Sequence, residues 1–140
     1  MQKQEIERKA FETYLSGYHC AEVISKTIIE AYVDASASIP KVASGFGGGV
    51  GRTFEDVCGI FSGGIIALGY LYGRVAPEEN VKETFELTAE WRKRFIAKVG
   101  STQCPDILKK LAEQDNMMKC KKLTAEMTGI LAELLDKPGN

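Results

Sequence analysis

Four cysteines are the side chains of this 140-residue chain best suited to chemistry: Cys20, Cys58, Cys104 and Cys120. Their spacing contains no Cys-x-x-Cys pair, no zinc-finger arrangement and no Cys-x-x-Cys-His haem-attachment motif. His19 is the single histidine, so the sequence excludes a Ser-His-Asp triad and any metal site with two histidines. The chemistry to expect is therefore that of sulfur, either redox exchange or metal binding.

Residues 44–73 form the stretch around which the chain is organised, a glycine-rich loop that leads into an uncharged segment. Five of the seven residues from 45 to 51 are glycine, which predicts tightly bent backbone. Thr53 followed by Asp56 resembles a helix capping box, so we expect a helix from Phe54 with Cys58 about one turn inside it. Residues 57–73 carry no charge, but their glycines favour a buried central helix over a membrane span.

Helical periodicity of the apolar residues predicts the elements that must position the cysteines. Helices are expected over residues 4–15, 19–35, 77–99 and 117–135, with a shorter one of about ten residues from Cys104 and a single helical turn over 38–45. No segment alternates with the period of a strand. We therefore expect a single all-α domain over residues 1–140, a bundle of about five to six helices around the central glycine-rich helix.

All four cysteines share one predicted position, in or beside the first turn of a helix and at the top of its apolar stripe. The partial positive charge of a helix N-terminus favours thiolate over thiol, and so favours both nucleophilic sulfur and metal–sulfur bonds. The lengths of the helices and connections allow the four helix starts to meet at one end of the bundle. The open alternative is four inert cysteines packed in the core as small apolar residues.

The charge balance argues against two classes of partner. Lys and Arg number 18 against 19 for Asp and Glu, which leaves no basic footprint for nucleic acid or for an anionic membrane. Residues 1–11 are charged and amphipathic, without the apolar core of a secretory signal. We therefore expect a cytoplasmic protein without structural disulfides.

Several short segments carry a family resemblance. The chain resembles the redox-active proteins named for the pattern C_GCAxxG_C_C, with Ile60 standing where the motif has alanine. That resemblance implies a redox role based on the cysteines, and similar domains of split-Soret cytochromes occur with haem and an iron–sulfur centre. The matching segments are Tyr18-His19-Cys20-Ala21-Glu22, Phe46-Gly47-Gly48-Gly49-Val50-Gly51-Arg52, Cys58-Gly59-Ile60-Phe61-Ser62-Gly63, Leu68-Gly69 and Tyr72-Gly73, followed by Cys104 and Cys120.

The first functional hypothesis is that the four cysteines ligate an iron–sulfur cluster, most simply [2Fe–2S], for electron transfer or redox sensing. Backbone N–H groups of the glycine-rich segments would then donate to the cluster sulfur atoms. The candidate cofactor-binding residues are Gly47, Gly48, Gly49, Gly51, Arg52 and Gly59.

Other readings stay open from the sequence. Cys20 and Cys58 could exchange as a dithiol–disulfide pair with a redox partner protein or reductant, with Arg52 or His19 stabilising a thiolate. The four sulfurs could instead bind zinc or another soft metal without catalysis. The glycine loop with Arg52 could cradle an anion, although it matches no phosphate-binding fingerprint, and glycine faces with Trp91 could serve a homodimer.

Overall fold

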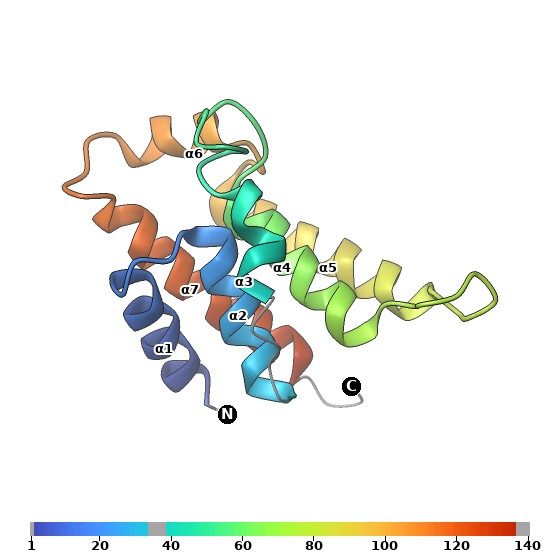
Figure 1. Cartoon of the computed structure of the whole chain (residues 1–140). Coiled ribbons are helices and arrows are strands. Elements are labelled where there is room, and N and C mark those ends of the chain that lie inside the picture. The colour runs from blue at the N-terminus through green and yellow to red at the C-terminus, as the bar shows by residue number, and fades with distance from the viewer. Residues whose placement is uncertain (1, 34–38, 137–140) are drawn as a thin grey trace.

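The computed structural model describes residues 2–33 and 39–136. Within these ranges the chain is helical and has no strand, and one isolated antiparallel bridge joins Val57 to Gln103. The all-α prediction is confirmed. The helices, shown in Figure 1, are α1 (Lys3–Leu15), α2 (Cys20–Tyr32), α3 (Ile39–Ala43), the short 3₁₀ turn η1 (Ser44–Phe46), α4 (Gly59–Tyr72), α5 (Lys82–Val99), α6 (Cys104–Leu111) and α7 (Met118–Leu135).

The bundle is built around α4, which packs against α2, α5 and α7, while α1 lies along α2 and α7 (Figure 1). Eight of the 14 residues of α4 are buried, in agreement with the predicted central helix. At one end of the bundle lie α6 and the loop that connects η1 to α4. This end contains the starts of the helices that carry the cysteines.

Trp91 is fully buried, so the expectation that it could serve a dimer surface is wrong. Its indole N–H donates to the Phe61 carbonyl oxygen at 3.1 Å, and its ring meets that of Phe95 edge-on at 5.6 Å. The indole lies directly against Gly64, where a Cβ atom would sit 2.6 Å from it. The glycine face of α4 is therefore used inside the bundle, to let α5 approach.

The start of α4 also differs from the prediction. The helix begins at Gly59 and not at Phe54, which has a positive φ of 59°. The Thr53 hydroxyl donates to the carbonyl oxygens of Gly49 and Val50 instead of capping a helix. Cys58 is consequently the residue immediately before the helix, and its N–H donates to the Thr102 carbonyl oxygen at 2.7 Å.

Other boundaries shift by a few residues. The helix expected from residue 77 begins at Lys82, because residues 76–79 form a turn closed by the Glu79 N–H and the Ala76 carbonyl oxygen. The helix predicted to reach residue 35 ends at Tyr32, and residues 34 and 35 lie outside the described ranges. The single turn expected over 38–45 is α3 followed by η1, with residue 38 again outside the described part of the chain.

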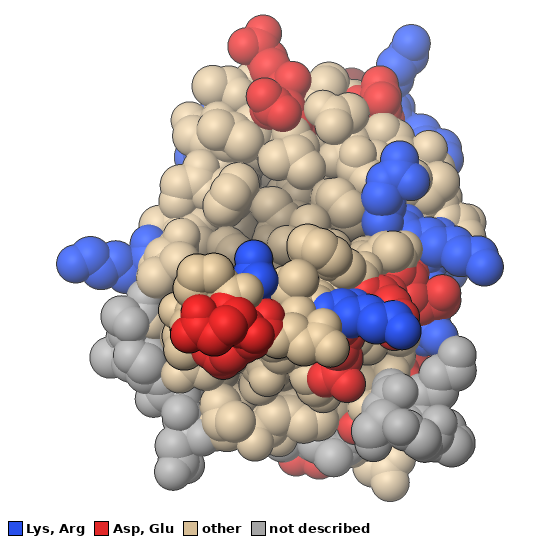
Figure 2. Space-filling view, turned by 90° about the vertical axis from the view of Figure 1, so that its right-hand side faces the viewer, with Lys and Arg blue, Asp and Glu red and all other residues tan. Residues whose placement is uncertain are grey.

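The surface carries both signs of charge. Figure 2 shows a face on which Lys, Arg, Asp and Glu are scattered among uncharged residues, without a continuous basic patch. No helix in residues 2–33 and 39–136 has the length and apolar character to span a membrane.

Candidate functional site

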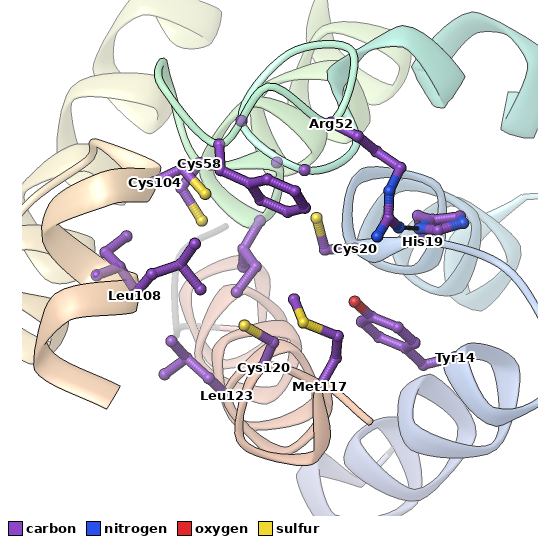
Figure 3. A pocket seen from close by; sticks show the side chains of 16 residues that line it. Tyr14, His19, Cys20, Arg52, Cys58, Cys104, Leu108, Met117, Cys120 and Leu123 are labelled. Carbon is purple, nitrogen blue, oxygen red and sulfur yellow. Dashed lines mark hydrogen bonds between the residues drawn. The ribbon is translucent and has the colours of Figure 1, made fainter. Parts of the chain in front are cut away.

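The four cysteines, separated by up to 100 positions in sequence, line one cavity (Figure 3). Cys20 and Cys104 are the first residues of α2 and α6, Cys58 directly precedes α4, and Cys120 lies in the first turn of α7. All four are free thiols. Much of the remaining wall is apolar: Phe54, Ile60, Ile107, Leu108, Met117 and Leu123.

The isolated bridge fixes Cys58 relative to Cys104. The N–H of Cys58 donates to Thr102, and the N–H of Cys104 donates to the Asp56 carbonyl oxygen at 2.8 Å. These two bonds flank the Val57–Gln103 pair. Because side chains alternate between the two faces of an extended pair, Cys58 and Cys104 project to the same face of the bridge.

Burial and backbone N–H donors shift the pKa of Cys20 and Cys58 in opposite directions. Burial raises the pKa of Cys20, whereas the N–H groups of Gly48 and Ala21 that face its sulfur lower it. Burial likewise raises the pKa of Cys58 to about 12, against the N–H groups of Ile60 and Phe61. Burial dominates at both sulfurs, which are therefore protonated at neutral pH.

The other two thiols follow the same pattern. Burial, followed by the negative charge of Cys120 and Cys20 when they ionise, raises the pKa of Cys104 to about 11. Burial also raises the pKa of Cys120, opposed by Gln114, whose amide Nε2 donates to the sulfur at 3.2 Å. The same amide accepts the N–H of Cys120 through Oε1 at 2.9 Å. Three of the four sulfurs thus face N–H donors.

The predicted glycine residues divide into two groups. Gly48, Gly49 and Gly59 line the cavity, as does Arg52, whereas Gly47 and Gly51 do not. A Cβ atom at Gly49 would lie 2.7 Å from the Cys104 Cβ, and one at Gly59 would lie 2.5 Å from the Cys20 sulfur. These two glycines are needed because a cysteine side chain occupies the space that their own side chains would take.

Arg52 and His19 lie side by side at the edge of the cavity (Figure 3). The Arg52 Nη1 is 3.1 Å from the His19 Nδ1, and the guanidinium stacks over the Phe54 ring. Because a guanidinium can only donate, Nδ1 of His19 is the acceptor in this contact.

Sequence reasoning missed several residues of the site. Gln114 lies between two predicted helices, and the apolar pattern gave no reason to expect that its amide would contact both the N–H and the sulfur of Cys120. Tyr14 lies in the helix predicted over residues 4–15, and its hydroxyl points into the cavity (Figure 3). The sequence signal that could have identified Tyr14 is its hydroxyl, a polar group on the apolar face of its helix.

The fold and the site define an all-helical protein with one four-cysteine pocket, in which each cysteine comes from a different helix start. The sequence matches the family model described as "Putative redox-active protein (C_GCAxxG_C_C)" over residues 18–134, and the chain belongs to that family. The resemblance found from the motifs is thereby confirmed. No curated protein and no solved structure matches the chain.

Proposed function

We propose that this protein is a cysteine-based redox protein whose four thiols hold an iron–sulfur centre, most simply [2Fe–2S], for electron transfer or redox sensing. The observation that supports this most directly is the common cavity lined by Cys20, Cys58, Cys104 and Cys120. Family membership supports the redox role in general terms.

The electrostatics of the sulfurs favour a bound electropositive centre over free thiolates. Burial raises the pKa of all four thiols, so none is ionised at neutral pH without help. The N–H donors at Cys20, Cys58 and Cys120 nevertheless face sulfur atoms, which suits atoms that carry negative charge. A metal centre deprotonates a coordinating thiol outright and so reconciles these two observations.

The distances between the cysteine side chains help to distinguish an iron–sulfur cluster from a site for a single metal ion. Among the described residues, no three His, Cys, Asp or Glu side chains are close enough to hold a single metal ion. A cluster distributes its cysteines over more than one iron, whereas a structural zinc site draws four ligands around one ion. We therefore place a cluster ahead of mononuclear zinc.

The surrounding residues have definite roles in this proposal. The N–H groups of Gly48 and Ala21 face the Cys20 sulfur and lower its pKa, and the Gln114 amide donates to the Cys120 sulfur, so both sulfurs have groups that stabilise negative charge. Hydrogen bonds to sulfur and exclusion of water are the means by which a protein sets the potential of such a centre. The apolar wall that includes Ile107 and Leu123 supplies the exclusion of water.

The decisive experiment is anaerobic purification followed by a visible spectrum and assays of iron and acid-labile sulfide. We expect a coloured protein that contains both elements, and loss of most of both in Cys58→Ser and Cys120→Ser. Lys122→Ser changes an exposed residue of α7 close to Cys120 and should retain them. Colourless protein without iron after cluster reconstitution would reject the proposal.

A second candidate is dithiol–disulfide exchange, and the bridge geometry favours Cys58 with Cys104 over the pair expected from sequence, Cys20 with Cys58. Two thiols would form one disulfide and pass two electrons and two protons to a redox partner protein or other oxidant. Iron-free protein whose thiol titre rises by two on reduction, but not in Cys58→Ser, would select this function.

A further inference from the structure

A second cavity opens beside the cysteine pocket and shares four of its lining residues. The shared residues are Tyr14, His19, Arg52 and Met117. We call this second cavity the vestibule; its other lining residues are Leu15, Gly17, Tyr18, Asn116 and Lys121. In Figure 3, Tyr14, His19 and Arg52 lie to the right of the four cysteines, and these three residues line the vestibule as well.

The vestibule has positive charge without a matching carboxylate. Arg52 and Lys121 line it, and no Asp or Glu lines either the vestibule or the cysteine pocket. Among the described residues, no ion pair involves Arg52 or Lys121. His19 contacts Arg52 through Nδ1, and an imidazole has no negative charge that could offset the two cations.

Lys121 is the more unusual of the two cations, because only 9% of its surface is exposed. Its Nζ lies 5.7 Å from the centroid of the Tyr14 ring, which is an interaction that stabilises a cation but does not neutralise it. Buried charges are ordinarily paired, since an isolated charge loses its hydration. Tyr14 connects the two cations, for its ring faces Lys121 while the positive charge of Arg52 acts on its hydroxyl.

The carboxylate that contacts the lining residue His19 is already engaged. Glu22 accepts the His19 N–H at 2.9 Å through Oε1 and the Ser44 hydroxyl through Oε2 at 2.7 Å. Its position caps the start of α2 and leaves the two cations without an acidic neighbour in the cavity lining. Two cations in a partly enclosed cavity concentrate anions from solution.

We propose that the vestibule binds the anionic group of a small organic molecule and holds it beside the cysteine site, with Arg52 and Lys121 as its charge partners. This inference rests on the proposed redox function of the cysteine site and assigns the class of small molecule that reaches it: a carboxylate or sulfonate, in preference to a cation. Cys20, beside Arg52 and His19 in Figure 3, is the thiol that such a ligand meets first.

The test uses three methanethiosulfonate reagents with different charges on the metal-free, reduced full chain. The sulfonatoethyl reagent is anionic, the trimethylammonioethyl reagent is cationic and the methyl reagent is neutral. Each transfers its alkylthio group to a cysteine thiolate and releases methanesulfinate. Rate constants at each cysteine are measured by mass spectrometry and divided by those of the same protein unfolded in urea, which removes intrinsic differences between reagents.

We expect the normalised anionic-to-cationic rate ratio at Cys20 to be about tenfold or more and to fall with added salt. The variant with both Arg52→Gln and Lys121→Gln should bring the ratio close to one while the neutral reagent reacts as before. Lys122→Gln, an exposed neighbour on α7, is the matched control and should leave the ratio unchanged. The pair Arg52→Lys and Lys121→Arg keeps both charges and should retain most of the preference.

Two results would contradict the proposal that the vestibule binds an anionic group. One is a ratio near one, or a ratio that the double variant does not change, while the neutral reagent still labels the native protein. The other is protection of every cysteine from the neutral reagent in the native state, because the thiols would then be closed to small molecules. Neither result touches the iron and sulfide assays, so failure of the vestibule is distinguishable from failure of the cluster.

Discussion

At the scale of single residues, Cys58 shows how burial makes a thiol a determinant of stability. Its pKa is about 12 in the folded chain against an ordinary value of 9.0, so between these values the unfolded chain releases a proton that the folded chain keeps. The contribution of Cys58 to the free energy of unfolding is therefore fully present below about pH 9. It is lost as the pH rises toward the pKa of Cys58 in the folded chain.

We accordingly predict that the metal-free, reduced protein unfolds at lower urea concentration as the pH rises from 8 to 10.5. Cys58→Ala removes this contribution, so the urea midpoint of that variant should fall less steeply over the same range. The other groups with raised pKa values, among them Tyr14 and Cys104, remain in both proteins, so the variant keeps part of the pH dependence. Equal pH slopes for the two proteins would contradict the assignment.

Alanine substitutions at two glycines of the loop distinguish two destabilising effects: strain of a positive φ, and a clash with a cysteine side chain. Gly49 and Gly51 have nearly equal positive φ angles of 64° and 63°, but only Gly49 lies against Cys104. Gly51→Ala should lose about 1 kcal/mol of unfolding free energy because of the positive φ. Gly49→Ala should lose about 1–2 kcal/mol beyond that and also lower iron content, since Cys104 must move.

Urea unfolding of both variants, with an iron assay, measures this difference. Equal losses in the two variants would mean that Cys104 accommodates the added methyl group without displacement.

Gln114 supplies a residue-scale test of the hydrogen bond to sulfur. Gln114→Leu removes the donor to Cys120, and loss of such outer contacts typically weakens a metal site about 10–100-fold. Competition of the loaded protein with a chelator should detect the change. Gln103→Leu is the control, because its exposed amide contacts Thr102 and no cysteine. Equal chelator resistance of the two variants would count against a role for Gln114.

At the scale of elements, α4 and α5 pack through a complementary pair of residues, one without a side chain and one with the largest. Gly64→Ala would place a methyl group 2.6 Å from the Trp91 ring, so we expect a loss of about 1–3 kcal/mol and a red shift in tryptophan fluorescence. Gly69→Ala lies on the same helix with nothing within 4 Å and should be neutral or stabilising by up to about 1 kcal/mol.

Urea unfolding monitored by Trp91 fluorescence compares the two variants directly. A Gly64→Ala protein as stable as the Gly69→Ala protein would show that the α4–α5 contact adapts.

The elements also show what the sequence could and could not predict. Amphipathic periodicity located α1, α2, α5 and α7 to within a few residues, because each buries apolar residues at helical spacing, on α5 only Trp91, Phe95 and Val99. The start of α4 was misplaced because the local signal of Thr53 and Asp56 competes with a bridge to Gln103, 46 or more positions away in sequence. A contact between distant segments leaves no local pattern.

For the candidate site, the sequence predicted the four cysteines but not the residues that contact them. Cysteines at helix starts identified which residues belong together, since each heads an apolar stripe directed at the core. The partners Gln114 and Lys121 come from turns and helix faces that local periodicity reads as ordinary surface. Their roles depend on which segments the fold brings together.

At the scale of the whole molecule, α6 is held by few contacts with the core. Its buried residues are Cys104 and Ile107, in contrast to the ten buried residues of α7. We predict that amide hydrogen exchange in α6 slows on loading of the cysteine site and is faster in Cys104→Ser, while α7 changes little. Exchange measured by mass spectrometry on loaded and metal-free protein tests this. Uniform changes across α6 and α7 would indicate global stabilisation instead.

The distribution of the cysteines along the chain has a consequence for synthesis of the protein. Cys20 leaves the ribosome about 100 residues before Cys120, an interval of roughly 5–20 s at ordinary translation rates. During that time the nascent chain lacks α7, which supplies a wall of the pocket and the helix against which α1 packs. The early thiols thus spend those seconds without the helices that bury them in the folded chain.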